Sequence, residues 1–425
     1  GRLPVWHLMG NETDCMNGNH SIPVIVDAYF KGYRNYDVAL AYEAIKKTAM
    51  QTRAGMDYVQ KIQYIPADSQ LESVANAMEY AIDDWCIAKM AYILDKPEDF
   101  NYFMKRSQNW KNIFDWETGF MRPKKNGGWD KPFDPREVNN NFTEGNSWQY
   151  SFFVPQDIEG MIEAYGGKEK FEAKLDEMFN SESKTTGREQ VDVTGLIGQY
   201  AHGNEPSHHM AYLYNYVGKP EKTNAKVKYI LDNFYTNTPD GLIGNEDCGQ
   251  MSAWYVLSSM GIYQVTPGIE FWTTINPPFF ESVQINLYDN KPKSVNLPYL
   301  KSGIFSKLDL RNNKTNEFEN IIPVPVIQGE SKAYKSFFEI TLKHSNEGAI
   351  WYRIIDSDNK DPKFIQSTKD KIIITESSKI EAYFIGSNGY TLAKSNTISA
   401  TFFKKPNNYT IEIKSKYNPQ YHAGG

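Results

Sequence analysis

The stretch SQLESVANAMEYAIDDWCIAKMAYIL, residues 69–94, carries the clearest helical signal in the sequence. Ser69 and Glu72 have the spacing of a capping box, in which each side chain binds a free backbone amide at the helix start. Apolar side chains then recur every three or four residues, so that they share one helix face: Leu71, Val74, Met78, Ile82 and Trp85. We expect a long helix over 69–94.

Further helical patterns extend on both sides of this stretch up to about residue 265, separated by Gly and Pro. They cover residues 36–50, 97–114, 156–165, 168–179, 206–217, 222–235 and 248–261. Ordinary connections are about 4 to 6 residues long, and the segments between these helices are longer and rich in Asn, Gly, Trp and acids. Long loops on a helical scaffold usually carry function.

After Pro277 and Pro278 the apolar pattern changes to an alternation with a period near two, which is typical of strands. The predicted strands are 282–287, 321–327, 337–342, 349–354, 371–375, 380–385, 397–403 and 409–413. The sequence therefore predicts a mostly α domain at 1–276, followed by a β-rich, antiparallel C-terminal region at 277–425. The loops of that region contain few clustered acids or histidines, so we expect no chemistry there.

Composition excludes several classes of partner. The 425 residues include 46 basic and 52 acidic side chains, giving a formal charge of −6, which offers no electrostatic footprint for nucleic acid or an anionic membrane. No stretch approaches the roughly 20 apolar residues of a membrane span, and the amino end lacks the pattern of a signal peptide. Three widely spaced cysteines favour buried small apolar side chains over a disulfide framework.

Acids, amides and histidines are concentrated in four segments that lie in loops or at helix starts. These segments are GNETD (10–14), FTEGNSWQY (142–150), YAHGNEPSHH (200–209) and GNEDCGQMSAW (244–254). Carboxylate and amide oxygens suit Ca²⁺, which takes about 6 to 8 oxygen ligands. Asn204, Glu205 and Asp247 are the candidate calcium ligands, with water completing the set.

The same residues have a purely structural interpretation. Pro206 stands where it would open a helix, so Asn204 could simply cap that helix and Glu205 could complement its dipole. Zinc is a weaker alternative to calcium: three histidines lie close together, but the H-E-x-x-H spacing is absent. They are His202, His208 and His209.

Acids flanked by aromatic residues also suit glycoside hydrolysis. That reaction needs one carboxylic acid to protonate the leaving oxygen and a second carboxylate to activate water or attack the sugar. Glu144, close in sequence to Trp148 and Tyr150, fits the acid, and the pair Glu246 and Asp247 fits the base. A solvated surface role is the common alternative for any single Glu, and the density of such residues in these segments argues against it.

These segments together resemble glycoside hydrolase family 92, whose members are calcium-dependent exo-α-mannosidases. The resemblance runs from Gly1 to about Pro278 and also includes IVDAYFKG (25–32), EYAIDDWC (79–86), GFMRP (119–123) and IGQY (197–200). It implies an (α/α)6 toroid preceded by a β-sandwich that is absent from this chain. Because the family's active site lies between those two domains, the missing half is an expected partner. The resemblance also implies a secreted, periplasmic or cell-surface location.

Roles follow from the resemblance position by position. Glu144 would be the general acid, and Asp247, assisted by Glu246, the base of an inverting reaction on a terminal α-linked mannose of an N-glycan or mannan. Asn204, Glu205 and Asp247 would hold Ca²⁺ against the mannose 2- and 3-hydroxyls. The sugar contacts would come from Trp6, Glu12, Asp14 and His202.

Two positions depart from the family pattern. Gln156 replaces a frequent histidine, and Gly203 stands where α-1,2-specific members tend to have an acid, which disfavours strict α-1,2 preference. Two other functions fit the same sequence: a glycan-binding or inactive structural module on this fold, and a metal-free (α/α)6 glycosidase or phosphorylase. Release of mannose that depends on Glu144 and on calcium would separate the three.

Overall fold

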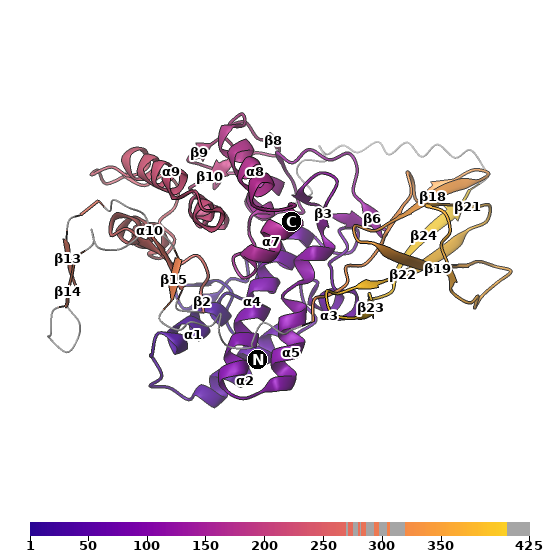
Figure 1. The fold of residues 1–425 in the computed structure, drawn as a ribbon, viewed down its shortest axis with the longest axis horizontal. Coiled ribbons are helices and arrows are strands. Elements are labelled where there is room, and N and C mark those ends of the chain that lie inside the picture. Colours follow the sequence, from indigo (N-terminus) through magenta and orange to yellow (C-terminus); the bar gives the residue numbers. More distant parts are fainter. Residues whose placement is uncertain are drawn as a thin grey trace.

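The structure is a computed structural model that describes residues 1–268, 271–274, 279–280, 282–285, 293–296, 304–306 and 319–405. Helices fill the amino-terminal part and an antiparallel β region occupies the carboxyl-terminal part (Figure 1). The helices are α1 (Ser21–Phe30), α2 (Val38–Ala49), α3 (Met56–Ile62), α4 (Ser73–Ile93), α5 (Pro97–Arg106), η1 (Asn109–Asn112), α6 (Ser147–Ser151), α7 (Ile158–Ala164), α8 (Lys168–Asn180), η2 (Glu205–Ser207), η3 (Met210–Val217), α9 (Pro220–Asn233) and α10 (Gln250–Ser259).

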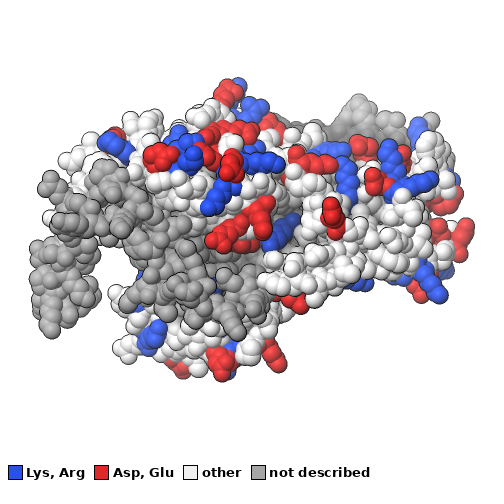
Figure 2. All heavy atoms as spheres, viewed as in Figure 1, with Lys and Arg blue, Asp and Glu red and all other residues white. Residues whose placement is uncertain are grey.

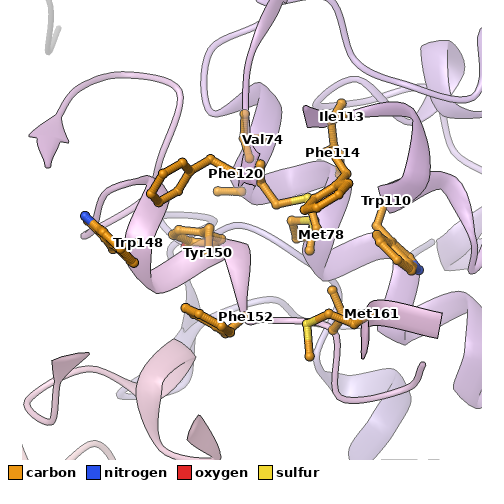
Figure 3. Packing of buried hydrophobic residues seen from close by; sticks show 14 of the residues in the cluster. Val74, Met78, Trp110, Ile113, Phe114, Phe120, Trp148, Tyr150, Phe152 and Met161 are labelled. Carbon is orange, nitrogen blue, oxygen red and sulfur yellow. The ribbon is translucent and has the colours of Figure 1, made fainter. Parts of the chain in front are cut away.

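Helix α4 is the central helix, in contact with α1, α2, α5 and α6 (Figure 1). It confirms the helix predicted from the sequence, and its side chains are buried almost all round, beyond the one face of the predicted apolar pattern. Val74 and Met78 lie among the rings of Trp110, Phe114 and Phe120 in the main core (Figure 3). Truncating such a side chain, as in Met78→Ala, typically costs about 2 to 5 kcal/mol.

The predicted capping box of α4 is wrong. The helix begins at Ser73, and Glu72 precedes it in a left-handed conformation with φ 54° and no side-chain cap. The loop at 140–141 replaces the box, because the Asn140 carbonyl accepts from the Glu72 amide and the Asn141 carbonyl accepts from the Val74 amide at 3.1 Å. A tertiary contact thus satisfies the amides that a local cap would have satisfied.

The other predicted helices all occur, with shifted ends. Residues 97–114 divide into α5 and η1, and residues 206–217 form the 3₁₀ segments η2 and η3 in place of one α-helix. The sequence prediction missed α1, α3 and α6. The predicted burial of the cysteines holds for Cys86 alone, since Cys15 and Cys248 are exposed.

Short strands connect the helices. They are β1 (His7–Leu8), β2 (Asn11–Glu12), β3 (Phe114–Asp115), β4 (Phe120–Met121), β5 (Lys124–Lys125), β6 (Gly128–Trp129), β7 (Glu137–Val138), β8 (Thr186–Gly187), β9 (Leu196–Ile197), β10 (Tyr200–Ala201) and β11 (Ile262–Tyr263). Strands β11, β12 (Phe271–Thr274) and β15 (Ile304–Ser306) form one sheet, and β13 (Ser282–Ile285) pairs with β14 (Lys293–Asn296).

Two sheets form the carboxyl-terminal β region. One has the strand order β16 (Val326–Gln328), β18 (Phe338–Lys343), β21 (Lys371–Ile374). The other runs β17 (Ala333–Tyr334), β24 (Ile398–Lys404), β22 (Ser378–Ser387), β19 (Gly348–Ile355), β20 (Ile365–Gln366), with β23 (Leu392–Lys394) paired to β22. Within the described strands of these two sheets, every pairing is antiparallel except β17 with β24. The predicted strand 409–413 lies outside the described residues.

The β region is attached to the helical part by a continuous core and by polar contacts. Val324, Ile327 and Ile340 belong to the same buried cluster as Val74 and Met78. The Asn126 side chain accepts from the Thr401 amide at 2.8 Å and donates to its carbonyl at 3.0 Å. These paired bonds fix one part against the other.

The surface agrees with the charge of the sequence. Figure 2 shows acidic and basic side chains interspersed over the described face, without a continuous basic patch. Among the described residues, no helix is both long enough and apolar enough to cross a membrane.

Candidate active site

Three loops, at 192–195, 202–205 and 243–247, are bound to one another beside β9 and β10. The Gly203 amide donates to the Thr194 carbonyl at 3.1 Å, and the His202 amide donates to the Gly195 carbonyl at 3.1 Å. The Asn245 side chain donates to Asp192 at 3.0 Å. The loops therefore present their polar side chains from one connected backbone.

Close packing of two glycines sets the distance between these loops. The Cα of Gly203 lies 3.0 Å from the position that a Cβ on Gly244 would take, and Gly244 has a left-handed φ of +99°. A Cβ on Gly203 would lie 1.9 Å from the Thr194 hydroxyl oxygen and 3.2 Å from the Ile243 carbonyl oxygen. Position 203 thus has no room for a side chain in this arrangement.

Replacing Gly203 by Ala is expected to destabilise the protein by about 1 to 3 kcal/mol, because the new methyl group overpacks the contact with Thr194. Urea unfolding measures the effect. A matched second variant, Gly203→Ala with Thr194→Ala, removes the clashing hydroxyl and should recover part of the loss. Equal midpoints for Gly203→Ala and the parent protein would show that the loops are not packed this closely.

Glu144 stands just before α6, in a left-handed conformation with φ 49°. The adjoining capping box holds this turn: the Asn146 side chain accepts from the Trp148 amide at 2.9 Å, and Gln149 accepts from the Asn146 amide at 2.8 Å. The Asn204 side chain donates to the Glu144 carbonyl at 2.9 Å and to its carboxyl oxygen Oε2 at 3.3 Å. Glu144 is thereby fixed against the 202–205 loop.

The Glu144 carboxyl is suited to hold a proton at neutral pH. Burial raises its pKa to about 7, with a further contribution from the negative charge of Asp192. The charges of Asp247 and Glu72 act in the same direction, and only the Asn204 hydrogen bond opposes them. A half-buried carboxylic acid surrounded by carboxylates is a chemical environment typical of a general acid.

Glu205 and Asp247 form a carboxyl pair. Burial is the main cause that raises the pKa of Glu205, to about 7, and the neighbouring Asp247 carboxyl, with which it shares a hydrogen bond, raises it further. The pKa of Asp247 is also raised, by burial first, while the shared bond with Glu205 opposes the rise. Two carboxyl groups in contact resist both being ionised, so protonation of the pair is favoured.

The predicted calcium ligands thus lie together. The Asn204 side-chain oxygen accepts from the Glu205 amide at 3.1 Å, which is the capping role that the sequence also allowed. Glu205 and Asp247 face each other across the two loops. Among the described residues, no group of three His, Cys, Asp or Glu side chains is arranged to hold a metal ion.

Glu246 binds backbone amides. Its carboxylate accepts from the Gly249 amide at 2.5 Å and from the Ser252 amide at 3.2 Å. A hydrogen bond with the Ser252 side chain, and then these two amide bonds, lower the pKa of Glu246. Glu246 therefore caps the first turn of α10 and holds the turn in which Asp247 has a left-handed φ of 52°. Glu246, which the sequence suggested as a catalytic residue, thus contacts the backbone of the turn that positions Asp247.

In the amino-terminal loop, Glu12 binds backbone amides, whereas Asp14 forms ion pairs. The Glu12 carboxylate accepts from the amides of Val5 at 2.7 Å, Trp6 at 3.0 Å and Asp14 at 2.7 Å, so it shapes the loop. Trp6 is half-buried. Asp14 pairs with Arg2 at 2.9 Å and also with Arg53.

The Asp14 and Arg53 pair lies near Tyr80 on α4. The Tyr80 hydroxyl donates to the Ala54 carbonyl at 3.2 Å, next to Arg53 in the chain. Burial raises the pKa of this hydroxyl, and the charges of Arg53 and Asp14 also act on it.

The prediction that His202 contacts a sugar is wrong for this structure. His202 is fully buried, and its two ring nitrogens are bonded to the Tyr200 and Tyr235 hydroxyls, each at 2.7 Å. Burial lowers its pKa to about 2, so the ring is neutral. Its ring packs edge-on against Trp254, with centroids 4.5 Å apart. His202 is a core residue that supports the loop beginning at Gly203.

The other two histidines also fail to form a zinc site. His208 Nε2 bonds the His202 carbonyl at 2.9 Å, and His208 Nδ1 bonds Gln250 at 3.0 Å. His209 Nε2 bonds the Phe152 carbonyl at 2.7 Å. Both are buried, which lowers the pKa of each to about 4. The histidine cluster is part of the packing beneath the site.

Two residues near the acids were not singled out from the sequence. Asp192 accepts from Gln190 at 2.6 Å and from Asn245, and its charge acts on both Glu144 and Asp247. Burial lowers the pKa of His20, but the Glu79 carboxylate at 2.8 Å and Asp83 raise it to about 9, and the charge of Glu205 also acts on it. Asp192 could have been found as an acid in the long loop before the 200–209 segment. His20 lies outside the four dense segments, so no sequence signal pointed to it.

A helical scaffold that gathers a carboxyl group of raised pKa, a carboxyl pair and amides suits glycoside hydrolysis. The model of the "Glycosyl hydrolase family 92 catalytic domain" matches residues 1–324, and the chain belongs to this family. The match continues past residue 276, where the sequence pattern changes.

Solved structures agree with this assignment. A family GH92 α-mannosidase from Bacteroides thetaiotaomicron, in complex with mannoimidazole, is 40% identical with a TM-score of 0.65, over 69% of this chain and 40% of that one. A family GH92 inverting mannosidase from Bacteroides thetaiotaomicron VPI-5482 is 32% identical with a TM-score of 0.62, over 77% of this chain and 44% of that one.

A fungal relative is also similar. A protein of Arthroderma benhamiae described as an uncharacterized secreted glycosidase is 29% identical over 326 residues, which is 67% of this chain and 40% of that protein. The chain thus spans less than half the length of the relatives that it matches.

Proposed function

We propose that the protein is an exo-acting α-mannosidase that hydrolyses terminal α-linked mannose from a glycan with inversion. The observation that carries the proposal is the Glu144 carboxyl group, whose pKa is raised to about 7 and which lies near the carboxyl pair of Glu205 and Asp247. The similar bacterial mannosidases support the choice of sugar, and the inverting relative supports the stereochemistry.

The overall architecture is part of the same proposal. We expect the helices of residues 1–276 to form an (α/α)6 toroid, followed by the β-rich region at 277–425. We also expect the complete enzyme to include an amino-terminal β-sandwich that completes the sugar-binding cleft. The secreted fungal relative supports a location outside the cytoplasm, in the periplasm, at the cell surface or in the medium.

Glu144 is the proposed general acid. Near neutral pH a substantial fraction of its carboxyl groups is protonated, and the Asn204 side chain holds the Oε2 oxygen at 3.3 Å. The proton passes to the glycosidic oxygen as the bond to the anomeric carbon breaks, so the leaving group departs as an alcohol.

Asp247 is the proposed general base, positioned by Glu246. The Asn204 side chain donates to Glu144 Oε2 and accepts from the backbone amide of Glu205, and the Glu205 carboxyl contacts that of Asp247. Inversion requires the acid and the base to lie about 6.5 to 9.5 Å apart, because a water molecule must fit between the base and the sugar. Asp247 takes a proton from that water as its oxygen attacks the anomeric carbon.

Calcium is the proposed cofactor. The donors fit it: two carboxyls in contact, each with a raised pKa, form a site that a divalent cation would stabilise, and Asn204 adds a hard amide oxygen. Asn204, Glu205 and Asp247 would hold the ion, with waters, and the ion would supply charge to bind and orient two sugar hydroxyls.

The remaining sugar contacts are assigned to the amino-terminal loop. Trp6 offers a half-buried ring for a sugar face, and Asp14, oriented by Arg2 and Arg53, offers acceptors for hydroxyls. Glu12 is assigned to the shape of that loop, since its oxygens accept three backbone amides.

The proposal is tested by proton NMR of the digest of a methyl α-mannobioside, whose blocked reducing end ensures that free mannose comes only from the cleaved bond. The first mannose released should be the β anomer, and EDTA should abolish its release while added Ca²⁺ restores it. Release of the α anomer first would contradict inversion. Full activity in EDTA would contradict the calcium role without affecting the acid and base. No release by the full-length protein would contradict the activity itself.

The pH profile of kcat/KM is expected to fall above pH about 7, by up to tenfold per pH unit, because Glu144 loses the proton that it must donate. Asp192→Asn removes a charge that raises this pKa, so the alkaline limb should move to lower pH. The asparagine keeps an oxygen for Asn245. A limb that stays in place in Asp192→Asn would show that another group sets it.

A further inference from the structure

A groove of about 450 Å³ separates the helical part from the β region. Its walls come from β3, α7, the segment before β16, and the turns that follow β18 and β22. None of its lining residues belongs to the acid cluster around Glu144 and Asp247. In Figure 1, β22 lies to the right of α4, whereas β10 and α10 lie to its left.

The groove is held open by bonds between its two walls. The Gln108 side chain donates to the Glu319 carbonyl at 3.3 Å and accepts from the Ile321 amide at 3.3 Å. The Asn112 side chain accepts from the Val324 amide at 2.8 Å. Lys343 pairs with Glu117 at 2.7 Å across the same junction. The cavity is therefore preformed, and its volume falls within the roughly 300 to 1,000 Å³ of small-molecule sites.

The aromatic wall of the groove suits a sugar ring. Trp116 is half-buried and packs edge-on against Trp129, with centroids 6.2 Å apart. Phe114 and Trp110 also line the groove, as buried rings whose centroids lie 6.3 Å apart. A partly exposed indole over a rigid aromatic base offers an apolar surface for the C–H face of a pyranose.

The polar wall suits hydroxyl groups. Asn320 accepts from Lys111 at 3.3 Å and Asn346 accepts from the Ser345 hydroxyl at 2.9 Å, so in both amides the oxygen is engaged while the NH₂ group is a donor. Glu163 supplies an acceptor. One lysine and one glutamate leave the lining without excess charge, which favours a neutral polyhydroxyl ligand over a phosphate or a carboxylate.

We propose that this groove is a second carbohydrate-binding site, which holds a neutral hexopyranose unit of the same glycan away from the hydrolytic centre. The choice of mannose-containing glycan rests on the proposed function, whereas the sugar class rests on the lining. A site of this kind raises the local concentration of chain ends at the active site.

The test is affinity electrophoresis of the full protein in gels containing α-mannan, with Glu144→Gln as the background so that the polymer is not consumed. Trp116→Ala removes the stacking ring, and Ala164→Trp fills the groove from the exposed end of α7 without removing a native contact. Each should weaken the mannan affinity by about tenfold, the value of one good aromatic contact. Phe337→Ala, an exposed aromatic of the β region outside the groove, is the matched control and should bind mannan as the parent does.

A second measurement separates this site from the hydrolytic one. In the background with an intact Glu144, the groove variants should keep the parent's kcat/KM on an aryl α-mannoside and its affinity for mannoimidazole. Unchanged mannan retention in Ala164→Trp and Trp116→Ala overturns the proposed site. Mannan retention that the groove variants weaken, in a protein that releases no mannose, would support the groove and overturn the proposed hydrolytic function.

Discussion

Replacing Glu144 by Gln is expected to lower kcat/KM on a mannobiose by about 10³-fold, since general acid catalysis typically contributes about 10² to 10⁴. The amide keeps the size of the side chain and can still bind Asn204, but it has no acidic proton for the glycosidic oxygen. Steady-state kinetics on a mannobiose measure the loss.

A substrate whose leaving group needs no proton distinguishes loss of proton donation from other effects of the Glu144→Gln substitution. On 2,4-dinitrophenyl α-mannoside, whose phenolate leaves without protonation, the same variant should lose no more than about tenfold. Exposed Glu182→Gln is the matched control and should keep full activity on both substrates. An equal loss on both substrates would assign Glu144 a role other than proton donation.

Replacing Asp247 by Asn should lower kcat/KM by about 10³-fold or more on every leaving group, because water activation is needed whatever departs. The amide also weakens the carboxyl pair with Glu205, so the calcium concentration for half-maximal activity should rise. Kinetics at saturating and limiting Ca²⁺ separate the two effects.

Glu246→Gln is the comparison for this variant. Its carboxylate binds the Gly249 and Ser252 amides, so we expect a lower thermal midpoint and a smaller fall in kcat than for Asp247→Asn. A loss in Glu246→Gln as large as that in Asp247→Asn, with the thermal midpoint unchanged, would make Glu246 the base and would contradict the role proposed for Asp247.

Much of the fold could be predicted because helix signals are local. Pro97 and Pro220 open α5 and α9, and the β-branched alternation at 349–354 matches β19. The capping box of α4 could not be judged locally, since the amides at its start bind carbonyls of the 140–141 loop. The short helix α3 begins after Gly55 with no capping side chain, so its start had no local signal.

The site was predictable to the extent that its residues lie in dense motifs. Among the residues singled out from these motifs, Glu144 contacts Asn204, and Glu205 contacts Asp247. His202 stands in the same motif, but the alternation of side chains along β10 and into the following turn sends it into the core, where Tyr200 and Tyr235 bind it. Motif density identifies a loop, whereas side-chain direction depends on tertiary packing.

The loop that caps α4 leads within a few residues to Glu144. Asn140 and Asn141 are bonded to the first turn of the most buried helix in the molecule, and Asn146 begins α6 just beyond the acid. Local opening of a protein is rarest where backbone amides are deeply packed. We therefore expect thermal fluctuations of the proposed proton donor to be damped from both sides, and hydrogen exchange at the Val74 amide measures how firmly this loop is held.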